Sequence, residues 1–209
     1  MLCNQCPRQC NAIRTSTQNI GGICAMPDSP VLSRAALHFW EEPSISGTKG
    51  SGTVFFTGCS LHCVYCQNND ISTNNKGKSI TIKQLADIFK RLENDGAHNI
   101  NLVTPTHFVN CIINALDIYK PSIPIVYNSS GYETVETIKR LKGYVDIYLM
   151  DFKYIDGKYL YLNTVGEEIE NISKQCSFSG IAGVWRNLNS EDIYITEFNK
   201  TKYGPIERH

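Results

Sequence analysis

Hydrophobic positions in the middle of the chain follow two alternating spacings. Short runs of β-branched, aromatic and aliphatic residues predict buried strands, and apolar residues at helical spacing between them predict amphipathic helices. Parallel strands need a crossover connection, which a helix supplies, so this alternation predicts an α/β fold with a parallel sheet. The predicted strands are 53–57, 99–104, 123–128 and 145–154, and the predicted helices are 80–97, 107–120 and 132–143.

Polar residues and cysteines follow the carboxyl ends of the predicted strands. In parallel α/β sheets these ends share one edge, and the residues just past them build the active site. The sequence therefore predicts a functional site at this edge. The segments expected there are Gly58–Cys66, Thr104–His107, Asn128–Gly131 and Asp151–Lys153.

The alternation is confined to one part of the chain, which divides it into three. Residues 1–50 form a Cys-rich N-terminal extension and a polar linker, without periodicity. Residues 51–155 hold the first four strand–helix units of the core. Residues 156–209 form a divergent tail in which the alternation is lost, and we assign no element to it.

Composition narrows the class of protein. The 20 Lys and Arg residues balance 20 Asp and Glu residues in a chain of 209 residues. A nucleic-acid or anionic-membrane partner would normally leave a basic excess. No apolar run approaches the roughly 20 residues of a membrane span, and the first residues lack the apolar core of a signal peptide. We therefore expect a soluble, cytoplasmic protein without a nucleic-acid or membrane partner.

Cysteine content changes this picture, because nine cysteines are many for a chain in a reducing compartment. Seven of them fall into two groups at short spacings, which is typical of metal ligands. The other two stand alone, and each is interpreted as a small buried hydrophobe. The groups are Cys3, Cys6, Cys10, Cys24 and Cys59, Cys63, Cys66, and the isolated residues are Cys111 and Cys176.

The second group forms a CxxxCxxC loop directly after the first predicted strand. Three thiolates bind three irons of a [4Fe–4S] cluster and leave the fourth iron without a protein ligand. The alternative is a structural zinc site, which needs four ligands. His62 is poorly placed to be the fourth, so the pattern favours a cluster on Cys59, Cys63 and Cys66.

The first group supplies four thiols at spacings of x2, x3 and x13. Four thiolates satisfy either a tetrahedral zinc ion or an auxiliary iron–sulfur cluster. Arg8 and Arg14 lie nearby in the sequence and would partly offset the negative charge. We expect Cys3, Cys6, Cys10 and Cys24 to hold a second metal, either zinc or an iron–sulfur cluster. The alternative is a group of redox-labile thiols without a metal.

The cysteine loop, with Tyr65 in its aromatic position, resembles that of the radical S-adenosylmethionine (SAM) superfamily. The longer stretches GTVFFTGCSLHCVYCQN, VTPTHF, IPIVYNSSGYE and VDIYLMDFKY resemble the branch related to pyruvate formate-lyase activating enzymes, over roughly residues 1–155. This resemblance implies a parallel (βα) barrel of the radical SAM type, and because the strand–helix pattern stops near residue 155 we expect it to be partial and incomplete at the C-terminus. It also implies SAM bound to the open iron and cleaved by one electron to a 5′-deoxyadenosyl radical. A flavodoxin- or ferredoxin-type reductant and a glycyl radical enzyme are the partners implied.

The resemblance also suggests SAM contacts at the strand ends. Thr104 begins the segment that stands where the family has a Gly-Gly-Glu, which binds the SAM amino group. For Asp151 and Lys153, which match an Asp-x-Lys, a strand-end salt bridge is an equal alternative. His107 is expected to be a surface or capping residue. The implied contacts are Tyr65, Thr104, Asn128, Ser129, Asp151 and Lys153, with Ser130 beside them.

The tail carries a second hypothesis. If the strand–helix pattern stops near residue 155, the last parallel strand is an exposed edge and the barrel is open on one side. The alternative is that the tail is a replacement that closes the sheet. A truncated, catalytically inactive iron–sulfur or zinc protein is therefore the alternative to a SAM-cleaving enzyme, and a zinc-stabilised interaction module built on residues 1–24 is a third.

Overall fold

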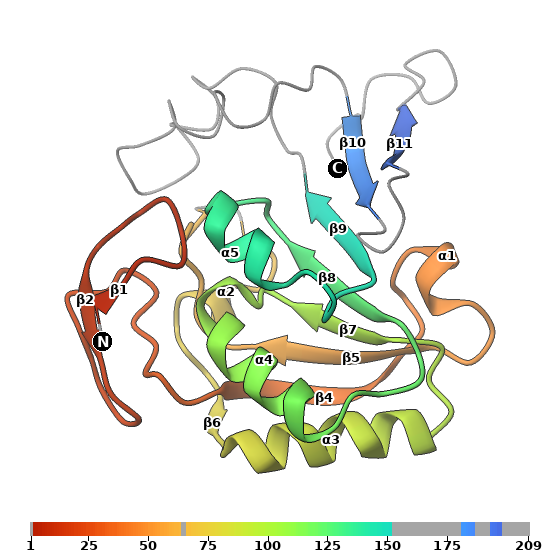
Figure 1. Cartoon of the computed structure of the whole chain (residues 1–209), viewed down its shortest axis with the longest axis horizontal. Coiled ribbons are helices and arrows are strands. Elements are labelled where there is room, and N and C mark those ends of the chain that lie inside the picture. The colour runs from red at the N-terminus through yellow and green to blue at the C-terminus, as the bar shows by residue number, and fades with distance from the viewer. Residues whose placement is uncertain (1, 64–65, 152–180, 187–192, 198–209) are drawn as a thin grey trace.

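A mostly parallel sheet forms the centre of the molecule in the computed structural model, which describes residues 2–63, 66–151, 181–186 and 193–197 (Figure 1). The sheet has the order β11-β10-β9-β8-β7-β5-β4-β6. Its four central strands are parallel neighbours, as the alternation predicted. They are β5 (Ser51–Phe56), β7 (Ile100–Val103), β8 (Ile125–Ser129) and β9 (Ile147–Asp151).

Antiparallel strands flank this parallel core on both sides. On one side β4 (Val31–His38) pairs with β5 and with the short β6 (Lys78–Ser79). No strand was predicted for the residues of β4. On the other side β10 (Ile181–Arg186) pairs antiparallel with β9, and β11 (Ile193–Glu197) pairs with β10. The expectation of an exposed last parallel strand is therefore wrong, because backbone of the tail pairs with it.

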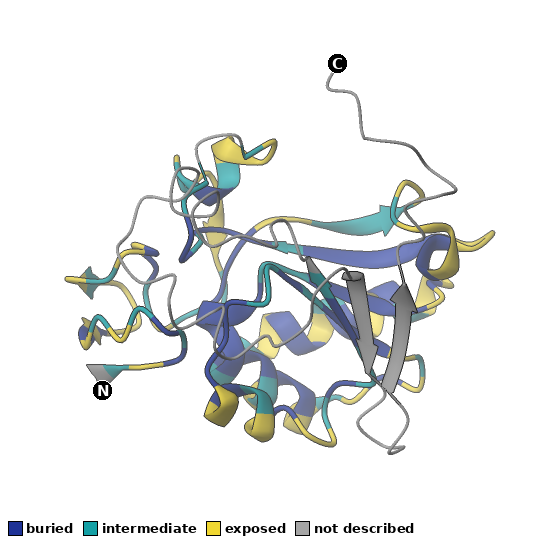
Figure 2. Cartoon of the chain, turned by 90° about the horizontal axis from the view of Figure 1, so that it is seen from above, coloured by how far each residue is buried: buried dark blue, intermediate teal, exposed yellow. Residues whose placement is uncertain are grey.

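Three helices cover one face of the sheet (Figures 1 and 2). They are α3 (Ile82–Asn94), α4 (Val109–Ile118), which follows the 3-10 turn η1 (Thr106–Phe108), and α5 (Val135–Arg140). Helix α3 begins at a capping box, in which Thr81 accepts from the Gln84 backbone and Gln84 accepts from the Thr81 backbone. The main hydrophobic core lies between these helices and the sheet, with Phe56, Leu102 and Tyr127 among its fully buried members.

The opposite face of the sheet is covered at one end by α1 (Pro43–Ser46). Ile45 of α1 packs in a second hydrophobic cluster with Val126 and Leu149. The residues next to these two in β8 and β9 belong to the main core under the helices, and side chains alternate along a strand, so the second cluster lies on the other face of the sheet. The Ile45 carbonyl also accepts a hydrogen bond of 2.8 Å from the Asn99 side chain. The segment predicted to be a polar linker therefore contains a short helix that closes the amino end of the strands.

The N-terminal segment forms a small sheet of its own, with the order β1 (Leu2–Cys3), β2 (Ala12–Arg14) and β3 (Asn19–Ile20). Figure 1 shows β1 and β2 beyond the ends toward which β5 and β7 point. The Cys-rich segment therefore lies at the carboxyl edge of the parallel sheet, where the sequence predicts the functional site. None of the helices that the structure describes is long and apolar enough to cross a membrane.

Candidate metal centre

The cysteine loop leaves the sheet through Gly58, directly after β5. Gly58 has φ +82°, a left-handed conformation that favours glycine. A Cβ atom here would lie 2.8 Å from the Cys24 carbonyl oxygen and 2.4 Å from the Met26 Cγ atom. The Gly58 amide donates to the Ile71 carbonyl at 2.8 Å. The N-terminal segment thus packs against the chain one residue before the first cysteine of the loop.

The three loop cysteines are partly buried free thiols, and hydrogen bonds are directed at the sulfurs of two of them. The Leu61 amide donates to Cys59 Sγ at 3.4 Å, and the Ser72 hydroxyl donates to Cys66 Sγ at 3.3 Å. Burial raises the pKa of the Cys59 thiol, while bonds from the Leu61 and His62 backbone lower it. The negative charge of Cys66 raises the pKa further, which places Cys59 and Cys66 within electrostatic reach of each other.

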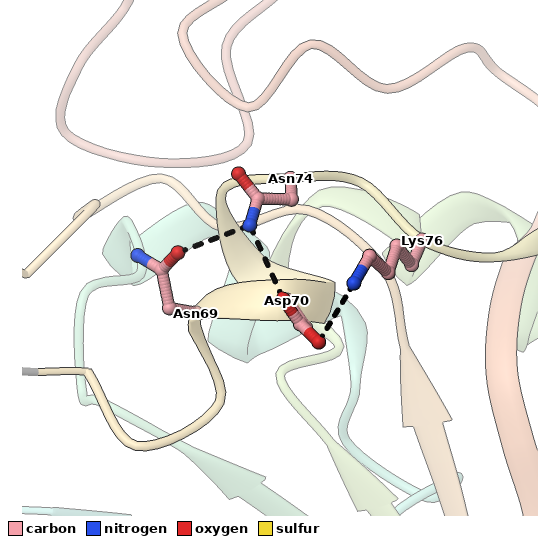
Figure 3. Close-up of polar contacts among 4 residues, drawn as sticks. All are labelled: Asn69, Asp70, Asn74 and Lys76. Atoms are coloured by element: carbon pink, nitrogen blue, oxygen red, sulfur yellow. Dashed lines mark hydrogen bonds and ion pairs between the residues drawn. The ribbon is translucent and has the colours of Figure 1, made fainter.

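Helix α2 (Asn69–Ser72) follows the last cysteine, and polar side chains hold it in place (Figure 3). The Asn69 amide donates to the Cys66 carbonyl at 3.2 Å. The Asn74 side chain donates to Asn69 and Asp70, and Lys76 Nζ donates to Asp70 at 2.8 Å. These contacts fix the short segment that carries Ser72 against Cys66.

The three cysteine ligands of the loop are of the type that binds an iron–sulfur cluster. Three thiols stand on one loop at the carboxyl edge, with N–H and O–H groups already aimed at two of the sulfurs. Thiolates are the ligands of such clusters, and hydrogen bonds to the sulfurs tune their potential. Among the described residues, no group of three or more His, Cys, Asp and Glu side chains is arranged so that it could hold a metal ion. The fit therefore rests on the ligand types and their loop.

The four N-terminal cysteines lie together. The negative charges of Cys3, Cys10 and Cys24 all raise the pKa of Cys6, which burial brings to about 12. The charges of Cys3 and Cys10 likewise raise the pKa of the buried Cys24 thiol. Two N–H groups approach these sulfurs: Arg14 donates to Cys3 at 3.6 Å and Asn19 donates to Cys24 at 3.8 Å. These four thiols are thus within electrostatic reach of one another, but within the described part of the chain no three of them are arranged so that they could hold a metal ion.

Direct hydrogen bonds link this N-terminal segment to the cluster loop. Arg8 Nε donates to the Ser60 carbonyl at 2.8 Å, and its NH2 group donates to the Leu61 carbonyl. The His62 side chain interacts with the backbone of Ile23, the neighbour of Cys24. The two cysteine groups are therefore parts of one structural region.

Behind the loop, Arg14 and His107 form a buried polar pair. His107 is 3% exposed. It lies against the Thr57 carbonyl, 2.7 Å from Nε2, so the tautomer with a proton on Nε2 donates there. Burial, reinforced by the positive charge of Arg14, lowers the pKa of His107 to about 3. Arg14 donates to the His107 carbonyl at 2.7 Å and to the Met26 carbonyl at 2.9 Å. The interpretation of His107 as a surface or capping residue is wrong: it holds the end of β5 from within.

The predicted SAM contacts are placed only in part. Thr104 has φ +57°, unusual for a β-branched residue, and its amide donates to the Asn128 carbonyl at 2.9 Å, joining the ends of β7 and β8. Ser129 is buried and donates to the Met150 sulfur at 3.0 Å, so its hydroxyl is directed toward β9. Asp151 ends β9, and its side chain is outside the described part of the structure, as are Tyr65 and Lys153. Cys176 is outside it too, whereas Cys111 is buried as predicted and donates to the Asp28 carbonyl.

One buried acid was missed by the sequence analysis. Glu133 is 6% exposed and accepts hydrogen bonds from Thr106 at 2.6 Å and Tyr127 at 3.3 Å. Burial raises the pKa of Glu133, and the hydrogen bonds of its neighbours lower it. The signal was its place shortly after a strand end, in YNSSGYE. Its partner Tyr127 belongs to the core on the helix-covered face, so Glu133 ties η1 to β8 behind the sheet.

Comparison with known proteins agrees with this geometry. The radical SAM superfamily profile matches residues 53–187, which is more than half of the chain and extends beyond residue 155 into the tail. An uncharacterized protein of Methanocaldococcus jannaschii is 37% identical over 161 residues, which cover 73% of this chain and 45% of the relative. The chain therefore spans less than half the length of that relative. With its cysteine loop at the carboxyl edge of a parallel sheet and the match over 53–187, the chain belongs to the radical SAM superfamily.

Proposed function

We propose that this protein cleaves SAM reductively and uses the resulting 5′-deoxyadenosyl radical to abstract a hydrogen atom, in a glycyl radical enzyme that it activates. The observation that carries the proposal is the loop of Cys59, Cys63 and Cys66, three free thiols directly after β5. A [4Fe–4S] cluster bound there supplies the electron for SAM cleavage and an iron open to the SAM amino and carboxylate groups. The superfamily profile covers this loop and supports that chemistry.

Residues around the cysteine loop hold it in place and shield it from water. Gly58 and His107 fix the end of β5, and Arg8 ties the Ser60 and Leu61 carbonyls to the N-terminal segment. Ser72 and the Leu61 amide donate to ligand sulfurs, which raises a cluster's potential. A radical intermediate needs a site closed to water, and the helix-covered sheet supplies a rigid wall for one.

SAM contacts at the strand ends follow from the resemblance. Thr104 and Asn128 meet at the carboxyl ends of β7 and β8, which supports a role for both. Tyr65, Ser129, Asp151 and Lys153 stay in the proposal as contacts from the loop and the ends of β8 and β9. A flavodoxin- or ferredoxin-type protein is proposed as the reductant.

A second metal is proposed at Cys3, Cys6, Cys10 and Cys24. The closeness of the thiols supports it, since the negative charges of Cys3 and Cys10, together with burial, raise the pKa of both Cys6 and Cys24. A bound cation would offset this repulsion, because cysteines bind metals as thiolates and the cation balances their negative charge. Metal analysis of the purified chain separates zinc from iron and sulfide.

One observation favours a second function. The place of the family's Gly-Gly-Glu is occupied by Thr104-Pro105-Thr106-His107, and His107 is buried against Thr57. A chain that lacks the amino-group contact would be an iron–sulfur or zinc protein that does not turn over SAM. Such a protein would retain its metal without responding to SAM.

Electron paramagnetic resonance (EPR) of the anaerobically reconstituted, reduced chain tests the proposal. SAM is expected to change the spectrum of the Cys59–Cys63–Cys66 cluster, because it binds the open iron, and the Cys63→Ala variant is expected to lose that signal. A spectrum that SAM leaves unchanged would favour the second function. Activation of a partner is tested separately, by the appearance of a glycyl radical doublet when a candidate glycyl radical enzyme and SAM are added.

A further inference from the structure

A cleft of about 530 Å³ lies between the N-terminal segment and helices α4 and α5. Hydrogen bonds tie its walls together. Thr137 of α5 donates to the Gln5 carbonyl at 2.8 Å, and Arg140 of α5 donates to Asn110 Oδ1 of α4. The volume is within the range of about 300–1,000 Å³ that is typical of ligand sites. The cleft is therefore formed and held by the chain itself before any ligand enters.

Side-chain amides are the main feature of its lining. A carboxamide carries a carbonyl acceptor and N–H donors, the same kinds of groups as a peptide bond. The aliphatic side chain of Ile113 also lines the cleft. This mixture suits the backbone of an extended peptide better than it suits an apolar ligand. The residues that supply the amides are Asn4, Gln5, Asn110 and Asn114.

Gln5 carries a hydrogen-bond acceptor that nothing satisfies within the described part of the chain. The residue is 7% exposed, and its Oε1 atom is buried without a donor. Such an orphaned acceptor lowers the stability of the free protein. The bond from Thr137 holds the Gln5 backbone in place, while the last torsion of a glutamine side chain is soft, so the amide can turn toward a donor in the cleft. A ligand N–H would supply the missing bond.

The charges of the lining favour an acidic ligand. Arg14 and Arg140 against Asp28 leave an excess of one positive charge. Arg14 is 4% exposed and donates to backbone carbonyls, so it contributes its charge rather than a contact. Arg140 is exposed, and its bond to Asn110 uses only part of its N–H fork. A carboxylate is the natural partner of the remaining N–H groups.

We propose that this cleft binds an extended, acidic peptide segment of a partner protein. A carboxylate side chain of the peptide pairs with Arg140, and one of its backbone N–H groups donates to Gln5 Oε1. The asparagine side chains bind neighbouring peptide groups. This docking site goes beyond the proposed function, and binding there requires neither a cluster nor SAM cleavage.

The first test incubates the full chain with an array of random eight-residue peptides whose termini are blocked. Bound peptides are expected to be enriched in Asp and Glu. The enrichment is expected to disappear in Arg140→Gln and to persist in Lys139→Gln, a matched exposed cation on the same helix. Binding without acidic enrichment, or the same enrichment in Arg140→Gln, would overturn the proposal.

The second test measures the affinity of the tightest peptide from the array by fluorescence anisotropy, in a double-mutant cycle. Arg140→Gln and replacement of the peptide's Glu by Gln are each expected to lower affinity roughly fivefold, as expected for an exposed ion pair. The two changes together are expected to cost no more than either alone, because they remove the same pair. Fully additive losses would contradict the pairing. Displacement of the peptide by an equal concentration of free glutamate would overturn the peptide assignment in favour of a small zwitterion.

A third measurement separates binding by Gln5 from a structural role. Gln5→Leu is expected to lower peptide affinity roughly fivefold, the loss of one hydrogen bond. The urea midpoint of the metal-free variant is expected to stay the same or rise, because the Oε1 atom has no donor to lose among the described residues of the free chain. An unchanged affinity with a lower midpoint would contradict the role of Gln5 in the site.

Discussion

The contact between the N-terminal segment and Gly58 leads to a prediction that can be worked out from the structure. Gly58→Ala places a Cβ atom 2.8 Å from the Cys24 carbonyl and 2.4 Å from Met26 Cγ, on a residue with φ +82°. The left-handed conformation costs an alanine roughly 1–2 kcal/mol. Overpacking against a backbone carbonyl adds about 1–3 kcal/mol. We expect a total loss of about 2–5 kcal/mol in the free energy of unfolding.

A matched variant separates the two contributions. Gly96 has φ +86°, and a Cβ atom added there would have no heavy atom within 4 Å, so Gly96→Ala carries the conformational cost alone. Urea unfolding of the reduced, metal-free chains measures both variants without linkage to metal binding. We expect Gly58→Ala to be less stable than Gly96→Ala by about 1–3 kcal/mol, the overpacking cost. Equal losses would contradict this expectation, because they would show that the N-terminal segment is not packed tightly against Gly58.

Three further predictions follow from buried or sulfur-directed groups. In the wild-type chain the free energy of unfolding is expected to fall by up to about 1.4 kcal/mol per pH unit between about pH 6.5 and pH 3, because the unfolded imidazole takes up a proton that the folded one, with its pKa of about 3, does not. The His107→Gln variant, which keeps a side-chain N–H donor, is expected to lose this part of the pH dependence in urea unfolding. A slope unchanged by the substitution would contradict the buried, neutral state. Glu133→Gln is expected to raise the urea midpoint at pH 8 more than at pH 4. The pKa of Glu133 is raised by burial, so its charged form lowers the stability of the folded state at high pH. A higher urea midpoint at pH 4 alone would contradict this. Ser72→Ala is expected to keep the cluster but lower its potential in EPR-monitored redox titration, because the O–H donor to Cys66 is lost; a raised potential would contradict the assignment.

The parallel core was predictable because its signals are local. Each of β5, β7, β8 and β9 lies within or near a predicted strand, since buried strands read as continuous apolar runs. Helix α3 was predicted two to three residues too long at each end, because propensity does not fix the caps that Thr81 and Asp95 supply.

The flanking elements could not be predicted in the same way. Strand β4 mixes buried, half-buried and exposed positions, so neither strict alternation nor a continuous apolar run marks it. Helix α1 has only four residues and is stabilised by Ile45 packing on distant strands. The pairing of β10 with β9 joins backbone segments far apart in sequence, and the hydrophobic periodicity of the tail did not predict it.

The cysteine groups were predictable from spacing, but their contact was not. Ligand spacing is a property of short segments, whereas the bonds from Arg8 to Ser60 and from Arg14 to His107 join residues 52 and 93 positions apart. The burial of His107 could not be predicted for the same reason, because its partners Arg14 and Thr57 are far from it in the sequence. Single-sequence patterns do not report such long-range contacts.

Whether the Cys59 loop supports radical chemistry is decided by SAM cleavage in the reconstituted chain under dithionite, with 5′-deoxyadenosine measured by mass spectrometry. We expect 5′-deoxyadenosine from the wild-type chain and none from Cys63→Ala. Iron and sulfide bound at the Cys59 loop without any 5′-deoxyadenosine would contradict it.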